Sequence, residues 1–170
     1  PTQRRDFLDK LLITRTPRLA GVISDYDRVV RQRNTLLKTR APESSLAPWT
    51  EQLISLGAQL TAERIALVEK LNPYVTAHYA KLNEVKTASI AYKSSTDGLS
   101  ADSDSNIAIL AEKQKEVAHN ESERGVSLVG PHRDDLHLHL GDFPAKGYAS
   151  HGESWSMAIA LRIGSFTLLR

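Results

Sequence analysis

Apolar residues recur at helical spacing along most of the chain, and they predict a succession of amphipathic helices. The first such positions, which follow an i, i+1, i+4, i+5 pattern, are Phe7, Leu8, Leu11 and Leu12. Thr16 and Pro17 predict the start of a second helix, because threonine caps helices and proline fits the first helical turn. The apolar positions of this second helix are Leu19, Val22, Ile23, Tyr26, Val29, Val30, Leu36 and Leu37.

A longer helix is expected from Trp49, after a turn over residues 41–48 that contains two prolines and two serines. Its leucines recur at spacings of three, four and seven, at Leu53, Leu56, Leu60, Leu67 and Leu71. About two to three heptads are present, which favours a helical hairpin packed on the preceding helix over a dimeric coiled coil. Pro73 is expected to kink or break this helix.

The second half of the chain predicts short strands between helices. Residues 88–93 form one strand, because Ile90 and Tyr92 alternate with small or polar neighbours. Residues 94–105 are rich in Ser, Asp and Gly and predict a mobile loop, and residues 106–124 predict a polar helix that stops at Gly125. Residues 126–129 and residues 136–140 predict the strands of a compact β-hairpin, the latter with leucines alternating with His137 and His139.

Ser150 and Glu153 stand directly ahead of an apolar run over residues 155–169, and their spacing is that of a capping box. Ser150 would accept a hydrogen bond from the backbone N–H of Glu153, whose side chain would reach back to the N–H of Ser150. Gly152 would lie in the first turn with no side chain to shield the backbone donors. Because a helix N-terminus combines free N–H groups with partial positive charge, this segment is either an ordinary helix start or an anion site.

Composition narrows the class of protein. A length of 170 residues favours one domain, or a domain with an appendage. The formal charge of +2 is too small to indicate nucleic-acid binding by itself, and the absence of cysteine excludes disulfides and thiolate chemistry. The absence of cysteine fits a reducing, cytosolic setting, so we expect a cytoplasmic protein. No apolar run reaches the length of a membrane span. The chain begins with proline and looks like a piece of a longer protein or a processed product.

A run of cations without any intervening acid lies between residues 28 and 40. Its members are Arg28, Arg31, Arg33, Lys38 and Arg40. Such a run is either a solvated helix face or a surface that contacts a phosphate backbone. These five residues are therefore the candidates for DNA contacts.

No complete catalytic set is present. His132, His137 and His139 lie beside Asp134 and Asp135, but no further ligand follows at a fixed offset, so we expect no metal site. Gly125 and Gly130 have the glycine spacing of a phosphate loop, yet proline and histidine stand where lysine and Ser/Thr are required. No serine lies in a nucleophile elbow either.

Two motifs near the C-terminus resemble those of the RecF family, bacterial recombination-mediator ATPases of the ABC/SMC class. They are Gly-Pro-His-Arg-Asp-Asp-Leu at residues 130–136 and Phe-Pro-Ala-Lys-Gly-Tyr-Ala-Ser-His-Gly-Glu-Ser-Trp-Ser at residues 143–156. Residues 4–9, residues 26–34 and the helix over residues 49–79 are also similar to that family. The resemblance covers essentially the whole chain, is weakest over residues 94–120, and is closest in style to actinobacterial members.

The resemblance implies an α+β fold, in which a mostly helical lid (a helical hairpin or bundle) joins a small β-hairpin and the signature helix of an ABC-type ATPase lobe. Residues 1–124 would be the lid, and residues 125–170 the signature-bearing part. The ABC signature motif would be Ser150, His151, Gly152, Glu153 and Ser154, facing the γ-phosphate of ATP held by the other subunit of a head-to-tail dimer. His132, Arg133 and Asp134 would form a motif that couples nucleotide state to the lid.

The family implies further partners. They are DNA, both duplex and at single-strand/duplex junctions, the proteins RecR and RecO, and a second copy in an ATP-dependent homodimer, at the nucleoid and with no membrane. These proteins serve DNA replication, repair and the SOS response. A full-length member also carries a phosphate loop and a magnesium-binding acidic strand, and neither occurs in these 170 residues. We therefore expect ATP and Mg²⁺ to serve the full-length protein, and this chain alone to bind neither and to hydrolyse no ATP.

The sequence alone leaves two alternative functions open. The chain could be a helical protein-interaction module without a nucleotide role, binding its partner through the face over residues 49–71. It could also be a metal-dependent enzyme that uses His132, His137 and His139.

Overall fold

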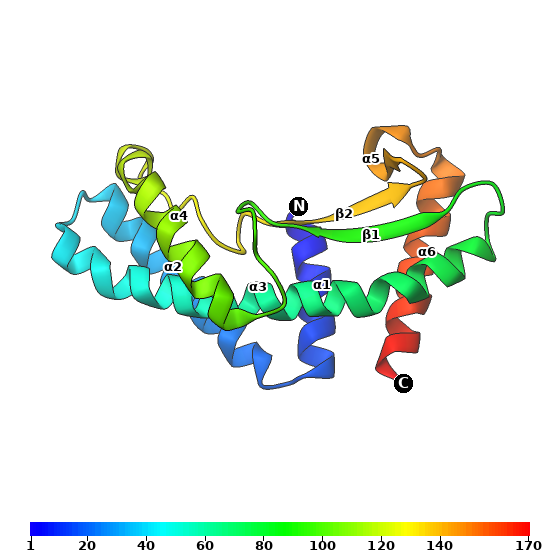
Figure 1. Ribbon diagram of the computed structural model, residues 1–170, viewed down its shortest axis with the longest axis horizontal. Coiled ribbons are helices and arrows are strands. Elements are labelled where there is room, and N and C mark those ends of the chain that lie inside the picture. The colour runs from blue at the N-terminus through cyan, green and yellow to red at the C-terminus, as the bar shows by residue number, and fades with distance from the viewer. The chain divides into compact units, whose positions relative to one another are not determined.

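The computed structural model describes residues 1–170, and its contacts divide the chain into two compact units. Unit 1 comprises residues 1–15, 65–93 and 135–170, and unit 2 comprises residues 16–64 and 94–134. The elements (Figure 1) are α1 (Thr2–Arg15), α2 (Leu19–Lys38), α3 (Glu43–Ala80), β1 (Ala88–Lys93), α4 (Ser103–Arg124), β2 (Asp135–Leu140), β3 (Phe143–Pro144), α5 (Ala145–Tyr148) and α6 (His151–Leu169). The fold is α+β and mostly helical, as the sequence predicts.

Unit 1 is built on a three-stranded antiparallel sheet in the order β1-β2-β3. The β1–β2 ladder runs from the pair Ala88–Leu140 to the pair Lys93–Asp135, and β2 turns back into β3 at Gly141 and Asp142. Helix α1 contacts both β2 and α6. The sheet and these helices enclose a core to which α1, α3, β1, β2 and α6 contribute Leu8, Leu11, Leu12, Leu71, Val75, Tyr79, Ala88, Ile90, Leu136, Leu140, Met157 and Ala160.

Helix α6 lies close to α3 because Gly164 faces α3 without a side chain. A Cβ on Gly164 would come within 3.3 Å of the backbone nitrogen and a methyl group of Val75. A hydrogen bond of 3.0 Å between His78 Nε2 and Thr167 Oγ1 joins the same two helices one turn further along. The position of α6 in unit 1 therefore depends on tight contact at a glycine.

Unit 2 packs α2, α4 and the first part of α3 around a separate core. Its buried apolar members are Leu19, Tyr26, Val29, Leu37, Leu46, Leu53, Ala58, Leu60, Ala62, Leu110 and Val129. Helix α4 begins at its N-cap Asp102, which accepts from the backbone N–H of Ser105, and ends at Gly125 with φ of 66°. The predicted stop at Gly125 is confirmed, and the helix starts earlier than residue 106.

The strand predicted over residues 126–129 is wrong. The backbone N–H of Ser127 donates to Asn34 Oδ1 at 2.7 Å, and that of Leu128 donates to Glu121 Oε1 at 2.6 Å. These side chains satisfy the backbone groups that a strand partner would otherwise have to bind. The hairpin predicted between residues 126–129 and residues 136–140 therefore does not form, and β2 pairs instead with β3 and with the distant β1.

Helix boundaries also differ from the sequence expectation. Helix α3 begins at Glu43, contains Pro48, and continues through Pro73 without a break. Both prolines are exposed, where the missing backbone hydrogen bond leaves a carbonyl that water can reach. Helix α2 begins at Leu19 with no side-chain cap, so Thr16 does not act as the predicted N-cap.

The predicted loop over residues 94–105 is anchored by hydrogen bonds. Asp134 accepts from the backbone and hydroxyl of Ser95, and Asn106 bonds both the N–H and the carbonyl of Ser100. Its last three residues form the first turn of α4. The division points of the two compact units also differ from the boundary expected at residue 124, which stays a prediction about domain organisation.

Gly130 occupies a position that only glycine fits, so a substitution there should destabilise unit 2. Its φ is 122°, and a Cβ there would collide with the hydroxyl of Tyr26. We expect Gly130→Ala to lower the free energy of unfolding by more than about 2 kcal/mol, since backbone strain and overpacking add. Urea unfolding followed by circular dichroism measures the change.

Gly141→Ala is the matched control for that substitution. Gly141 also has positive φ (58°), but nothing lies within 4 Å of its Cβ position, so it should lose only about 1 kcal/mol. The double variant Tyr26→Phe, Gly130→Ala should recover part of the loss. Equal losses at the two glycines would show that the collision with Tyr26 is not what matters.

Candidate functional site

The start of α6 has the capping geometry that the sequence predicts. Ser150 is the N-cap, with extended backbone angles, and its Oγ accepts from the backbone N–H of Glu153 at 3.2 Å. Glu153 Oε2 accepts from the backbone N–H of Ser150 at 2.7 Å. Both halves of the capping box are therefore formed, and the first turn of α6 is held in one conformation.

Two backbone donors remain at this helix start. His151 and Gly152 are the first two residues of α6, so their N–H groups have no acceptor within the helix. Both residues are exposed, and nothing lies within 4 Å of a Cβ position on Gly152. The N–H of Glu153 is taken by Ser150, and the hydroxyl of Ser154 donates to the carbonyl of Ser150 at 2.9 Å. An approaching anion therefore meets His151 and Gly152 first.

A lysine from another part of unit 1 reaches the start of α6. Lys86, in the loop between α3 and β1, places its Nζ 2.7 Å from Glu153 Oε1. The bond from Lys86, with those from the backbone and hydroxyl of Ser150, lowers the pKa of Glu153 from 4.5 to about 2. The carboxylate therefore stays ionised at pH values below 4.5, and it binds both Lys86 and the helix start.

The arrangement can bind an anion but holds no reactive group. Backbone N–H groups at a helix N-terminus favour phosphate-like oxygens, and the helix dipole adds to that preference. No three His, Asp or Glu side chains meet at a distance that could hold a metal ion. His137 and His139 share one face of β2 with ring centroids 6.0 Å apart.

Within the motif at residues 130–136, His132 and Arg133 have a structural role in unit 2. His132 Nδ1 lies 2.7 Å from the hydroxyl of Tyr26, and its Nε2 lies 3.1 Å from the carbonyl oxygen of Ser127. Arg133 Nε donates to the same carbonyl at 3.1 Å. The side chains of His132 and Arg133 thus hold the turn at Gly130 against α2 and the segment after α4.

The two neighbouring aspartates of this motif hold different segments. Asp134, which is buried, accepts from the backbone N–H of Ser95 at 2.7 Å within unit 2. Asp135 accepts two hydrogen bonds from the guanidinium of Arg4, at 2.8 and 2.6 Å, within unit 1. The pKa of Asp135 is lowered chiefly by this bond from Arg4. Asp134 therefore holds the loop before α4, and Asp135 holds α1 against β2.

Comparison with known proteins places the chain in a family. No family model matches it. The DNA replication and repair protein RecF of Streptomyces avermitilis is 46% identical over 181 aligned residues, which cover 100% of this chain and 48% of that protein. The chain belongs to the RecF family. It spans about half the length of the curated relative it matches.

Solved RecF structures have the same fold. Two structures of the recombination mediator protein RecF in the RecFOR pathway, one with ATP and one with ATPrS, each superpose with a TM-score of 0.92. Each covers 99% of this chain, and the chain covers 47% of the ATPrS structure and 46% of the ATP structure. Sequence identities are 20% and 21%, so these matches establish the fold of this RecF segment and no more.

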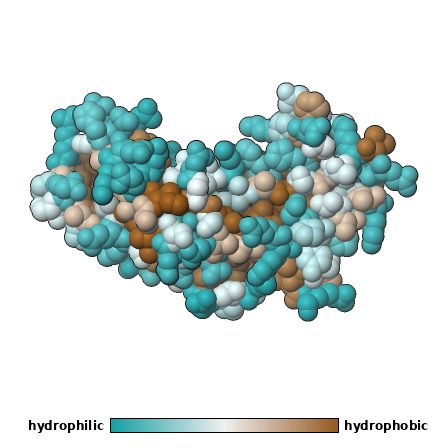
Figure 2. Space-filling model, in the orientation of Figure 1, coloured by the Kyte–Doolittle hydropathy of each residue, from teal (hydrophilic) through white to brown (hydrophobic).

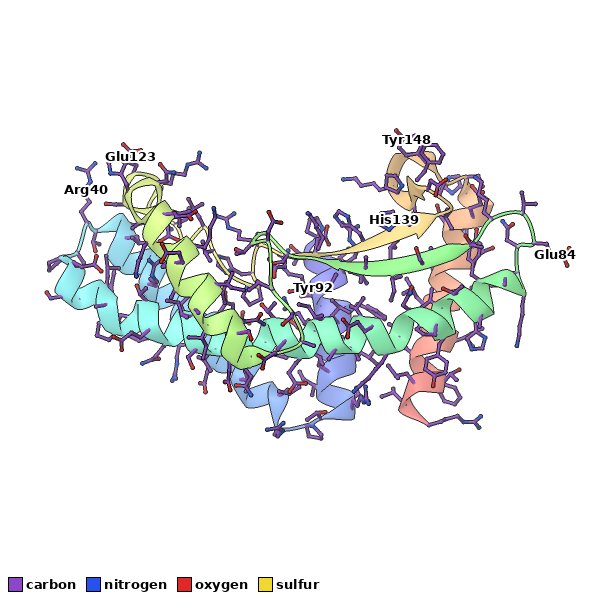
Figure 3. The ribbon with its side chains drawn as sticks, in the orientation of Figure 1. Arg40, Glu84, Tyr92, Glu123, His139 and Tyr148 are labelled. Carbon is purple, nitrogen blue, oxygen red and sulfur yellow. The ribbon has the colours of Figure 1, made fainter.

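The cations proposed for DNA contact lie along α2 of this RecF-family chain and just beyond its end. Arg31, Lys38 and Arg40 are exposed, and Arg40 projects outward at the end of α2 (Figure 3). Arg28 is also exposed but forms an ion pair with Asp25 at 3.0 Å. Figure 2 shows a largely hydrophilic surface with scattered hydrophobic patches. These four residues remain predictions for DNA contact.

Arg33 does not belong with them. Its side chain is 4% exposed, and its Nη2 lies 2.7 Å from Glu121 Oε2. Arg33 also donates to Thr50 Oγ1 and to Ser127 Oγ, at 2.9 Å each. Its guanidinium therefore joins α2, α3 and α4 inside unit 2 and cannot reach a ligand at the surface. The signal lay in the sequence, because Arg33 continues the buried stripe of Tyr26, Val29 and Leu37.

Lys86 is the site residue that the sequence did not reveal. It stands in a short polar loop, about 65 positions before the start of α6, and no spacing rule connects the two. None of the helices combines the length and the apolar character that a membrane-spanning helix requires.

The Glu153 carboxylate should contribute to the pH dependence of the free energy of unfolding. Its folded-state pKa is depressed, so its contribution is fully present above about 4.5 and is lost as pH falls through about 2. We expect Glu153→Gln to reduce the fall in unfolding free energy between these two pH values. Urea unfolding at a series of pH values measures this, with carbon-detected NMR giving the midpoint for the Glu153 carboxyl.

Glu84→Gln is the control for this series. Glu84 lies in the same loop as Lys86, and its side chain projects away from the helices (Figure 3). The Glu84 variant should keep the pH profile of the parent. A Glu153 titration midpoint near 4.5 would contradict the role of the ion pair with Lys86.

Proposed function

We propose that this chain is the lid and signature-bearing part of a RecF-type recombination mediator, which acts in DNA replication and repair. The identity of 46% to a RecF protein along the whole chain supports the assignment. One feature of the chain itself also supports it: the capped start of α6 presents exposed N–H groups at Gly152 and His151, as an ABC signature motif requires. RecF of the solved structures is described with ATP, which is the ligand we propose.

The proposed ligand is the γ-phosphate of ATP carried by a second subunit. The start of α6 offers donors and the helix dipole, but this chain contains no phosphate loop to hold the rest of the nucleotide. The hydroxyl of Ser150 and the N–H groups of His151 and Gly152 would contact the γ-phosphate. ATP bound by the partner would thereby join two subunits head to tail, with Mg²⁺ held by the partner's own residues.

An ATP-dependent dimer gives the first test. In a full-length RecF-family protein that carries this sequence, Gly152→Asp puts a carboxylate at the proposed phosphate position. Because like charges repel across such an interface, ATP-dependent dimerisation should weaken by about tenfold or more. Analytical ultracentrifugation over a series of ATP concentrations measures it.

Gly21→Asp is the matched control for the dimer experiment. Gly21 is an exposed helical glycine of α2 with nothing within 4 Å of its Cβ position, so the charge change is the same at a remote site. Dimerisation should be unchanged there. If Gly152→Asp dimerises as the parent does, the start of α6 does not bind the partner's ATP, and the proposed signature role is wrong.

The lid is proposed to bind DNA through the exposed cations of α2. Phosphate contacts release condensed counterions, so affinity falls as salt rises. Arg31, Lys38 and Arg40 are free of the internal network that holds Arg33. A duplex with a single-strand junction is the proposed substrate, and RecO and RecR are the proposed protein partners.

Arg31 and Arg33 give opposite expectations for DNA binding. Arg31→Ala should reduce the slope of log affinity against log salt by about 0.9, since one phosphate contact is lost. Arg33→Met should leave the slope unchanged and should cost about 3–5 kcal/mol of stability, because it leaves Glu121 buried and unpaired. Fluorescence anisotropy with a labelled junction duplex, over a salt series, measures the slopes. Affinity without salt dependence would reject the DNA contact.

The alternative function, a helical protein-interaction module, required an exposed apolar face over residues 49–71. Within the face over residues 49–71, the leucines Leu53, Leu60, Leu67 and Leu71 are buried inside the chain. They stabilise the fold and are not available to a partner.

A further inference from the structure

The loop that carries Lys86 has a defined structure built on one asparagine. Asn83 Oδ1 accepts from the backbone N–H of Val85 at 2.9 Å and from that of Lys86 at 3.3 Å. Asn83 Nδ2 donates to the hydroxyl of Tyr79 at 3.3 Å, and Tyr79 is fully buried at the end of α3. The backbone of Lys86 is therefore anchored to the core of unit 1 through two side chains.

This anchored backbone brings the side chain of Lys86 to the start of α6. Lys86 Nζ lies 2.7 Å from Glu153 Oε1, while Glu153 Oε2 accepts from the N–H of Ser150 at 2.7 Å. The side chain of Glu153 is 15% exposed. A continuous series of bonds thus runs from Tyr79 through Asn83 and Lys86 to the carboxylate of the capping box.

The capping box creates an electrostatic problem for a phosphate ligand. Glu153 caps the helix with a full negative charge, close to the two N–H groups that an anion would use. A second anion at His151 and Gly152 would be repelled by that carboxylate. Neutralisation by a fixed cation removes most of the repulsion while leaving the cap intact.

We propose that Lys86 is a positioning residue of the signature site, which holds the Glu153 carboxylate on the capping box and cancels its charge so that the helix start accepts a triphosphate. Lys86 does not contact the phosphate, because its Nζ is engaged with Glu153. The inference rests on the proposed function, since the triphosphate is the γ-phosphate end of the partner subunit's ATP. The lowered pKa of Glu153 agrees with it, because the bond from Lys86 stabilises the ionised carboxylate.

A heterodimer with one working composite site tests the role of Lys86. One full-length subunit carries a disabled phosphate loop and an intact signature, and the other carries an intact phosphate loop and Gly152→Asp. With different fluorophores on the two subunits, energy transfer reports dimerisation as ATP is added. Only the signature of the first subunit and the ATP of the second can form the site.

Lys86→Ala in the subunit with the intact signature should raise the half-maximal ATP concentration by about fivefold, the scale of a single exposed ion pair. The same substitution in the Gly152→Asp subunit should leave that concentration unchanged. Lys86→Arg should restore it, because arginine keeps the charge and reaches the carboxylate. Asn83→Ala in the first subunit should act in the same direction as Lys86→Ala, since the loop is then unanchored.

Lys113→Ala is the matched control. Lys113 forms an ion pair of 2.6 Å with Glu116 on α4, with a side-chain exposure of 41% against 43% for Lys86. This variant should leave the ATP dependence unchanged in either subunit. Equal effects of Lys86→Ala in both subunits, or an equal effect of Lys113→Ala, would overturn the proposal, as would no effect in the first subunit.

The proposed function and the role of Lys86 can fail separately. Absence of ATP-dependent transfer in the reference heterodimer overturns the proposed function and the phosphate role of Lys86 with it. NMR of the 170-residue chain decides independently whether Lys86 holds the carboxylate. The titration midpoint of Glu153 should rise in Lys86→Ala and stay low in Lys113→Ala, and an unchanged midpoint in Lys86→Ala overturns the proposal.

Discussion

The antiparallel pairing of β1 with β2 is the constraint on which the proposed signature site depends. It pairs Ala88 with Leu140, and the N–H of Gly141 donates to the carbonyl of Thr87 at 2.8 Å. These bonds bring the loop before β1 next to the turn after β2, and α6 begins shortly after that turn. The ion pair between Lys86 and Glu153 follows from this adjacency. A shift of register in the ladder would move Lys86 away from the capping box.

Unit 2 depends on a different interaction, the buried ion pair of Arg33 and Glu121. Glu121 also accepts from the backbone N–H of Leu128, and Arg33 reaches Thr50 and Ser127. Charges taken out of water are stabilised when they are paired and their own polar atoms form further hydrogen bonds. The pair therefore specifies how α2, α3 and α4 meet, and it shapes the segment that leads to Gly130. The family resemblance marks the following residues 130–136 as functional, while the contacts of His132 and Arg133 show a structural role.

Much of the architecture could be predicted because it is encoded locally. The apolar stripe of α1, the stop at Gly125 and the capping box at Ser150 each depend on residues within one or two turns. The predictions that failed concern residues whose conformation or burial depends on partners far away along the chain. Residues 126–129 are apolar enough for a strand, but Asn34 and Glu121 bind their backbone. Arg33 lies in a run of surface cations, and a glutamate on another helix makes its burial possible.

For the proposed site, the sequence by itself determined the helix start, its glycine and its cap, because a capping box closes within four residues. Together with the neighbouring Gly-Pro-His-Arg-Asp-Asp motif it also determined the family. Only the tertiary structure decided that Lys86 pairs with Glu153, and that Glu121 is the partner of the buried Arg33. The reason is physical: an ion pair needs two side chains within about 4 Å, and strand pairing and helix packing, not spacing along the chain, bring them that close.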